Sequence, residues 1–443
     1  MKITGESWNL AADRIGLVGL YIFSFFAFLG AGGAYAGLIL MLLALFMNFR
    51  SNFLSLINNR FVMLIGIFLV YLMIRTTLAV YESPDIAYLH KQEAWSWSHL
   101  GLVVLVAWWL AKDRNRISVI LLLALSGFLL DILSNVDWDR LDALLRGLRT
   151  GFGMQIISFG LYCATAIMGL ILCAPRLIGD IKYPVSLVLR SIFWLAALTI
   201  CLQGLLTSQS KGALLSAVIM LPVVVIARIW ISFKRHGSLR WKVTFVVGLA
   251  VSLLMTGILS VNNKELLKNR FLAEKQTILS LSDLENIPYS SLGYRIRSSI
   301  LGLESWLSRP VLGLGPGASK SVIANSDDEK LRHLAHLHNS YVEVLVRFGL
   351  AGFVIFIVGI WWIFKSLYEA SKQKLLKLDS ALFVAGAFGL TLIWCLAEFR
   401  MTHIPWRFYW MLFGAIAISF AFVETQEKNP DSEDRNFETD EVY

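Results

Sequence analysis

Three histidines lie in a short polar run before a long apolar stretch. Residues 333–339 read HLAHLHN, so His336 and His338 are two positions apart. Histidines at this spacing can bind a metal, but no carboxylate or cysteine at a familiar spacing completes a site, and we predict no metal. A histidine at a membrane surface can instead act as a general base, because its ordinary pKa lies near neutral pH. That chemistry requires a substrate hydroxyl within hydrogen-bonding distance.

Two arginines and a glycine-rich turn precede the histidines. Arg295 and Arg297 are followed by the sequence GLGPG at 313–317. Arginine presents a planar fork of donors that binds phosphate oxygens bidentately, and Gly315 and Gly317 would let backbone N–H groups approach a phosphate. The pattern indicates a phosphate site, and a tight turn beside a solvated basic surface is the alternative.

A lysine lies at the boundary between two apolar stretches. Residues 207–212 read TSQSKG, which places Lys211 near the start of a predicted helix. A helix N-terminus with a lysine suits an anion. In the alternative interpretation, Lys211 only extends its ammonium group to the membrane interface.

Cations for a diphosphate and a base for a hydroxyl together indicate group transfer from a phosphate-activated lipid. There is no ATP outside an inner membrane, so a transferase there needs a donor that arrives already activated. A polyprenyl diphosphate sugar meets this requirement. We predict no cofactor, and without a metal the fixed cations must stabilise the charge that develops on the leaving diphosphate.

The composition indicates which elements position these residues. Of 443 residues, 57% are hydrophobic and 16% charged, and the mean hydropathy is +0.64, whereas soluble domains have about 45–50% apolar and about 25% charged residues. A spanning helix needs about 20 apolar residues, so we expect an all-α polytopic membrane protein with about 12 transmembrane helices. The predicted spans are 15–32, 34–49, 61–79, 99–111, 117–133, 154–174, 185–206, 212–232, 241–261, 341–365, 380–399 and 405–423.

Lysine and arginine in the short loops predict the orientation. Positively charged loops stay cytoplasmic, and alternate loops carry the cations, among them Arg50, Arg176 and Lys234. Both termini are then cytoplasmic, and the three chemical features lie on the opposite, outer face. The net charge of +9 therefore reflects topology, and we predict no nucleic-acid partner.

This topology divides the chain into four parts. Residues 1–261 hold the first nine spans, 262–340 a large loop on the outer face, 341–423 the last three spans, and 424–443 a disordered acidic cytoplasmic tail. A loop of that length is expected to contain its own elements and a function. Helical spacing predicts an amphipathic helix from Tyr294 to Leu307 over the bundle. Its apolar line is Ile296, Ile300, Leu303 and Leu307.

Two further features carry no predicted chemistry. The four cysteines lie in apolar runs without a C-x-x-C pair, so we expect no disulfide framework and no zinc site. Residues 34–36, AYA, resemble a signal-peptide cleavage site, but a retained first span explains the same residues.

One segment resembles the signature of a known family. Residues 338–352 read HNSYVEVLVRFGLAG. This is similar to the signature of bacterial O-antigen ligases, which is His, then Asn, Ser or Gln, nine residues, Gly, two residues and Gly. The segment from Arg295 to Gly317 also resembles the large periplasmic loop of the ligase and polymerase superfamily. Elsewhere, apart from the region around Lys211, the likeness extends only to hydropathy and span count.

The resemblance implies a GT-C-type glycosyltransferase-like fold. It also implies a metal-independent, inverting transfer of a glycan from undecaprenyl diphosphate to the core sugars of lipid A. His338 would activate the acceptor hydroxyl, Arg295 would bind the donor diphosphate, and Lys211 would add a second cation. The family has arginine where this chain has Lys211, and lysine keeps the charge but loses bidentate binding. The predicted substrate-binding residues beside these three are Arg297, His336, Asn339, Gly315 and Gly317.

Three other functions fit the same residues. An O-antigen or exopolysaccharide polymerase shares the fold, donor and loop, and uses a second lipid-linked glycan as acceptor. A protein-glycosylating relative is expected to have a larger periplasmic extension. A lipid-linked glycan transporter would also have about a dozen spans, but the chain shows no repeat of two related halves, and its ionisable residues gather at the outer surface instead of mid-membrane.

Overall fold

The computed structural model describes residues 5–47, 58–145, 148–178, 184–234, 272, 274–275, 277–280 and 286–422. The predicted span 241–261 and the predicted tail 424–443 lie outside these residues. Within them the regular elements are helices, and no strand occurs. The helices are α1 (Gly5–Leu29), α2 (Ala31–Met47), α4 (Arg60–Glu82), η1 (Pro84–Ile86), α5 (Ala87–Ser98), η2 (His99–Leu102), α6 (Val103–Ala111), α7 (Arg116–Ser134), η3 (Trp138–Arg140), α8 (Leu141–Leu145), α9 (Ile156–Leu172), α10 (Ala174–Ile178), α11 (Pro184–Ser208), α12 (Lys211–Lys234), α15 (Ser291–Leu307), α16 (Ala318–Ala324), α17 (Ser340–Lys372), α18 (Leu378–Trp394) and α19 (Ile404–Ser419).

Seven of the described helical segments are long and apolar enough to cross a membrane, and α2, α9 and α18 are shorter apolar helices. Outside 241–261, every apolar stretch expected from the sequence overlaps a described helix, although α18 ends at Trp394, before the predicted end of the span 380–399. The chain is therefore a polytopic helical membrane protein, as predicted. The seven candidate spans are Asn9–Leu29, Arg60–Glu82, Pro84–Ala111, Arg116–Ser134, Val185–Ser208, Lys211–Ile231 and Ser340–Lys372.

The fourth span begins earlier than its apolar pattern predicts. Sequence placed it at 99–111 and assigned the preceding residues to a loop, but α5, η2 and α6 form one continuous helical segment from Pro84 to Ala111. Polar residues interrupt the apolar pattern of α5, yet His90 and Glu93 are buried. Tertiary packing against α4 and the glycine-rich turn overrides the local pattern here.

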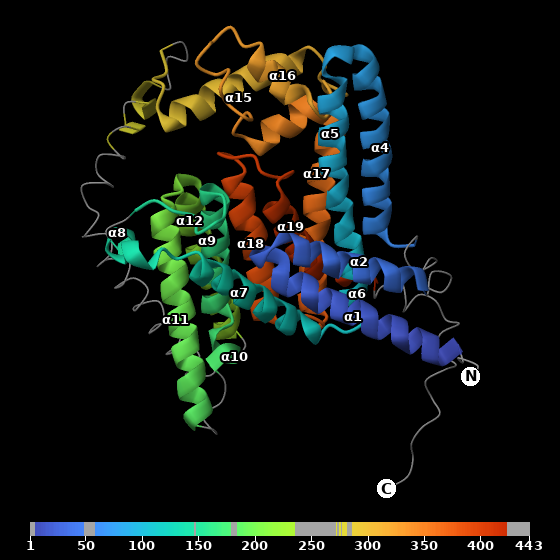
Figure 1. Ribbon diagram of the computed structural model, residues 1–443, viewed down its shortest axis with the longest axis vertical. Coiled ribbons are helices and arrows are strands. Elements are labelled where there is room, and N and C mark those ends of the chain that lie inside the picture. Colours follow the sequence, from blue (N-terminus) through green and yellow to red (C-terminus); the bar gives the residue numbers. More distant parts are fainter. Residues whose placement is uncertain are drawn as a thin grey trace.

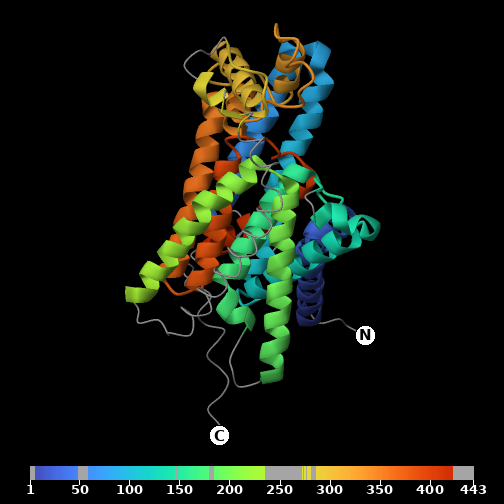
Figure 2. The same ribbon diagram turned by 90° about the vertical axis from the view of Figure 1, so that its left-hand side faces the viewer.

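The helices form a bundle with a cap at one end. In Figure 1, α15 and α16 lie across the upper end of the molecule, beside the tip of the α4–α5 hairpin and the start of α17. Figure 2 shows that α11 and α12 diverge toward the opposite end. Within the bundle, α9 packs against α11, α12 and α18, while α19 packs against α6. The predicted catalytic residues lie where the cap meets this bundle.

The predicted amphipathic helix is present as α15, but a different line of residues is buried. Ser290 caps its start by accepting a hydrogen bond from Gly293 N at 3.1 Å. The buried positions are Gly293, Ser298 and Gly302, whereas Leu307 is 66% exposed. A Cβ at Gly302 would lie 2.5 Å from a methyl group of Val342. Small residues thus let α15 approach α17 closely, which the apolar periodicity did not predict.

A buried glycine interrupts the helical geometry of α17. Gly349 has a positive φ of 61°, a conformation that glycine adopts without steric cost. The released backbone groups pair with the glycine-rich turn: Leu314 N donates to Val346 O at 2.7 Å, and Gly315 N to Arg347 O at 2.9 Å. The first glycine of the HN-x9-G-x2-G signature therefore connects α17 to the preceding turn.

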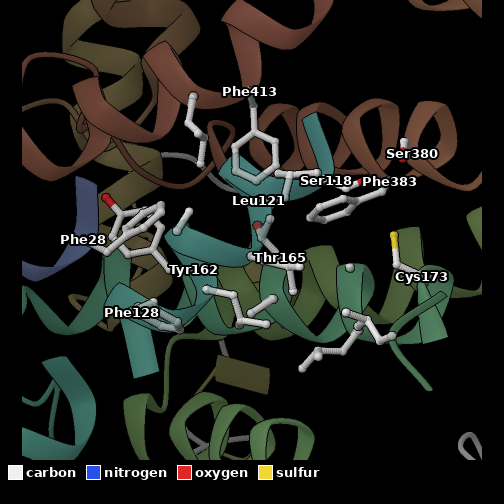
Figure 3. A pocket seen from close by; sticks show the side chains of 18 of the residues that line it. Phe28, Ser118, Leu121, Phe128, Tyr162, Thr165, Cys173, Ser380, Phe383 and Phe413 are labelled. Atoms are coloured by element: carbon white, nitrogen blue, oxygen red, sulfur yellow. The ribbon is translucent and has the colours of Figure 1, made fainter. Parts of the chain in front are cut away.

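A separate apolar cavity of about 210 Å³ lies among α7, α9, α18 and α19 (Figure 3). Phe28, Phe128, Phe383 and Phe413 line it, together with Tyr162 and Thr165. Its described lining contains no histidine and no carboxylate.

Candidate active site

The turn that carries His338 leads directly into α17. Asn339 is the N-cap, and its Oδ1 accepts hydrogen bonds from Tyr341 N at 3.0 Å and Val342 N at 3.2 Å. In the described contacts Asn339 is the cap of α17. The sequence predicted that it binds substrate. His338 has a positive φ of 56°, which costs a non-glycine residue about 1–3 kcal/mol. Neighbouring contacts must hold His338 in this conformation.

Glu398 lies at the centre of the site. Its carboxylate is 1% exposed, and its Oε1 lies 3.0 Å from His336 Nε2 and 3.7 Å from His338 Nδ1. Two guanidinium groups approach the same carboxylate, with Arg400 Nε at 3.3 Å and Arg295 Nη2 at 3.9 Å. Glu398 thereby joins the predicted base to the predicted phosphate-binding arginine.

His336 supports this arrangement with both ring nitrogens. Its Nδ1 accepts a hydrogen bond from the His338 backbone N–H at 3.2 Å. In the neutral ring the proton therefore sits on Nε2, which donates to Glu398. His336 is buried. Both ring nitrogens therefore contact the protein itself, and the substrate contact of His336 stays a prediction.

The electrostatic environment leaves His338 able to accept a proton. Burial lowers the pKa of His338, and the neighbouring Glu398 carboxylate opposes this effect. Burial alone would raise the pKa of Glu398, but the hydrogen bond from His336 and the positive charge of His336 and His338 when they are protonated hold it well below its usual range. A neutral imidazole thus lies beside an ionised carboxylate at neutral pH. Because 3.7 Å is too long for a hydrogen bond, Glu398 acts on His338 through its charge.

Arg295 connects the start of α15 to the turn after α18. Its Nε donates to Ala397 O at 2.8 Å, and its Nη1 donates to the backbone O and Oγ of Ser291 at 2.8 and 2.5 Å. Its Nη2 faces Glu398 at 3.9 Å. The guanidinium is therefore held next to the carboxylate that contacts His338.

Lys211 is the first residue of α12 and shares a cavity with Arg295. The turn before it contains Gln209 at a φ of 49°, and Ser210 Oγ accepts a hydrogen bond from Ala213 N at 3.4 Å. Lys211 Nζ forms an ion pair with Glu274. A polar cavity of about 60 Å³ is lined by Lys211 and Arg295 together with Glu398.

Arg297 lies in a different environment from Arg295. Its Nε and Nη2 donate to Ile287 O at 2.9 and 2.6 Å, and its guanidinium lies 4.6 Å from the centre of the Tyr289 ring. It is not among the residues that line the cavity with Lys211. These contacts secure the segment before α15, so the structure separates Arg297 from the other predicted site residues.

Gly315 and Gly317 pack against the α4–α5 hairpin. Gly315 has a φ of 107°, and a Cβ there would lie 2.4 Å from Ala79 Cβ. A Cβ at Gly317 would lie 2.6 Å from the Leu89 carbonyl carbon. The Gly317 N–H donates to His90 Nδ1 at 3.1 Å. Both glycines are buried, with backbone donors bonded within the protein, which is the geometry that the tight-turn interpretation expects.

A buried network of charged side chains supports the turn that contains His338. Glu343 on α17 is fully buried; its Oε1 accepts a hydrogen bond from Leu337 N at 2.8 Å and its Oε2 accepts one from Arg347 Nε at 2.6 Å. Arg347 also donates to Glu93 on α5 at 3.0 Å and to Pro316 O. This network ties the hairpin, the glycine-rich turn and the residue before His338 together.

Sequence reasoning missed Glu398 and Glu343. Both fall inside segments predicted to span the membrane, 380–399 and 341–365. An ionisable residue within a predicted span is a functional candidate by default because its burial in lipid is costly. That signal was present for both residues, but it does not indicate which residue each one contacts. For Glu398 the contact with His338 could not be predicted, because the two residues are far apart in the sequence.

His336, His338 and Glu398 form a set that could also hold a metal ion. One ligand atom from each lies within 4.8 Å of the others. The sequence-based argument against a metal rested on the lack of a carboxylate, and Glu398 supplies one. Two arginines near the same carboxylate disfavour a further cation electrostatically.

The fold and the site together define a polytopic membrane protein with its ionisable cluster at one end of a helical bundle. Residues 196–357 match the family model described as O-antigen ligase. The resemblance expected from the sequence is therefore confirmed over this segment, which is similar to the O-antigen ligase model of the ligase and polymerase superfamily, whose members are glycosyl-transfer enzymes. The segment includes Lys211, Arg295 and His338. No match was found among curated proteins.

Proposed function

We propose that the chain is an O-antigen ligase, which transfers a glycan from undecaprenyl diphosphate to a sugar hydroxyl of lipid A-core. The observation that carries this proposal is that Glu398 lies beside both His338 and Arg295, and that Glu398 and Arg295 line a cavity together with Lys211. A base, an orienting carboxylate and two cations are the groups that metal-independent transfer from a diphosphate needs.

In the proposed step, His338 takes the proton of the acceptor hydroxyl as its oxygen attacks the anomeric carbon of the donor glycan. The bond between that carbon and the phosphate oxygen breaks, and undecaprenyl diphosphate leaves with the electron pair. Attack from the side opposite the leaving group inverts the anomeric configuration. Glu398 stabilises the resulting imidazolium, because its ionised carboxylate lies 3.7 Å from His338.

Arg295 and Lys211 would meet the negative charge that develops on the leaving diphosphate. Arg295 is held in place by Ala397 and Ser291, so it needs little reorganisation when substrate binds. Lys211 is paired with Glu274, whose Oε2 accepts hydrogen bonds from Ser290 Oγ at 2.8 Å and Leu292 N at 3.2 Å. A bound diphosphate would compete with this carboxylate for Lys211.

We infer a periplasmic site in the inner membrane, with about twelve spans and the domain division at 261, 340 and 423. The charge distribution supports this orientation. The cap of α15 and α16 lies at the end of the molecule opposite α10, which carries Arg176 of a basic loop (Figure 1). Basic loops remain cytoplasmic, so the cap would face the periplasm.

The glycan profile of a deletion strain tests the assignment, with lipid A-linked and undecaprenyl diphosphate-linked material separated. A ligase predicts long glycan chains accumulating on the carrier lipid and bare lipid A-core. A lipid A-core still capped by a single repeat unit would indicate a polymerase instead. If both pools are unchanged, the chain has neither role, and an exopolysaccharide polymerase or a transporter becomes the better assignment.

The metal alternative has its own test. Wild-type protein purified in EDTA and assayed in EDTA is expected to retain full activity, because fixed cations replace the metal. Loss of activity that added Mg²⁺, Mn²⁺ or Zn²⁺ restores would assign His336, His338 and Glu398 to a metal site.

A further inference from the structure

A second arginine lines the cavity that contains Lys211 and Arg295. Arg149 precedes α9, and its side chain is exposed at the cavity wall. Three segments that are far apart in the sequence therefore each contribute one cation to a polar cavity of about 60 Å³. This convergence is not explained by the family match, since Arg149 lies outside residues 196–357.

Local contacts hold Arg149 against the turn that carries Lys211. Arg149 Nε donates to Ser208 O at 3.4 Å, and the next residue, Thr150, donates its backbone N–H to Thr207 O at 3.3 Å. Beyond it the chain turns at Phe152, which has a φ of 47° and is buried. The guanidinium is thus attached to the α11–α12 turn, only a few residues from Lys211.

The other two cations are poorly suited to grip a diphosphate on their own. Lys211 is a point charge without a planar fork of donors, and it is paired with Glu274. Arg295 donates its Nε to Ala397 O and its Nη1 to Ser291. A diphosphate has two phosphoryl groups, so a planar guanidinium on a third wall would add the bidentate contact that Lys211 cannot make.

We propose that Arg149 is a third diphosphate-binding residue, and that it compensates for the lysine at position 211. This inference rests on the proposed function and assigns the donor subsite of the same cavity. Arg149 and Lys211 would contact the diphosphate from adjacent positions on the α9 and α12 sides, while Arg295 approaches from α15. The contact should favour a diphosphate over a monophosphate, because the latter is too short to engage all three cations.

Binding of glycan-free undecaprenyl diphosphate tests this role without requiring transfer. The probe is titrated in detergent into purified full-length protein, and apparent affinity is measured from thermal stabilisation. Arg149→Ala is expected to weaken binding by about tenfold to a hundredfold, the range for a hydrogen-bonded contact with a charged group. The same substitution should weaken the binding of undecaprenyl monophosphate by a smaller factor. The matched control is Arg140→Ala, which removes an exposed arginine that pairs with Asp137 at 3.4 Å and does not line the cavity.

Compensation between positions 149 and 211 is tested by a double-mutant cycle. Lys211→Arg alone should change diphosphate affinity by less than threefold, because Arg149 already supplies a fork. In the Arg149→Ala background, the same change should recover at least half of the lost affinity on a logarithmic scale. An equal effect of Lys211→Arg in both backgrounds would overturn the compensation.

The outcomes separate this role from the proposed function. If wild-type protein binds the diphosphate and Arg149→Ala binds it as tightly as Arg140→Ala does, Arg149 has no part in the site while the ligase proposal stands. If the wild-type protein shows no binding, the donor site itself is wrong and both proposals fall. A thermal unfolding midpoint of the unliganded Arg149→Ala protein that equals the wild-type value shows that the variant is folded.

Discussion

Replacing Glu398 with glutamine removes the charge beside His338 while keeping the size of the side chain. Glu398 Oε1 lies 3.7 Å from His338 Nδ1, and the carboxylate is 1% exposed. Two unit charges about 4 Å apart interact by about 4 kcal/mol at an effective dielectric constant near 20. That interaction is made with the imidazolium that forms as His338 accepts a proton, and its loss corresponds to a rate decrease of roughly a thousandfold. We expect the decrease in kcat, with KM little changed.

The pH dependence gives the same prediction a second readout. His338 acts as a base only when neutral, and burial lowers its pKa below the ordinary value while Glu398 raises it. Removing the carboxylate lowers this pKa further, so the acidic limb of the pH–rate profile should move to lower pH in Glu398→Gln. Transfer by purified protein is measured across pH, with Glu304→Gln on the exposed side of α15 as control. Activity within threefold of wild type and an unmoved acidic limb would refute the reasoning.

The remaining predictions concern the other charged residues. Arg295→Lys should lower kcat/KM with a labelled donor at least tenfold, because the charge remains but the contacts with Ala397 and Ser291 are lost. Full activity would exclude a diphosphate contact at this residue. Lys211→Ala should raise the KM for donor, whereas unchanged kinetics would mean that Lys211 only reaches the membrane interface. Glu343→Gln should destabilise the protein by about 3 kcal/mol, since it leaves Arg347 in a buried network without its nearest carboxylate, and an unaltered thermal midpoint in detergent would contradict this.

Strong local signals in the sequence predicted the elements that hold the site. Apolar stretches predicted the spans, and helical spacing predicted α15. The start of α17 at Ser340 agrees with the predicted span 341–365, with Asn339 as its N-cap. These features depend on residues close together in the chain, so a single sequence is enough to find them.

Long-range contacts could not be predicted in the same way. Glu398 lies near His338 because the turn between α18 and α19 packs against the start of α17. Ser340 Oγ donates a hydrogen bond to Glu398 O there at 2.7 Å. The glycine-rich turn illustrates a second difficulty. A phosphate cradle and a close helix contact both require a residue without a Cβ, and only the position of α4 and α5 distinguishes them at Gly315.

The most direct test of the central claim is transfer by purified protein in detergent, without a sealed compartment. Undecaprenyl diphosphate-linked glycan and lipid A-core are mixed with wild-type protein or with His338→Ala, and glycan-bearing lipid A is quantified. We predict transfer by the wild type and a loss of at least a thousandfold in the variant with the thermal midpoint retained, because the only proposed base is gone. Near-normal transfer by His338→Ala, or no transfer by the wild type, would contradict the account.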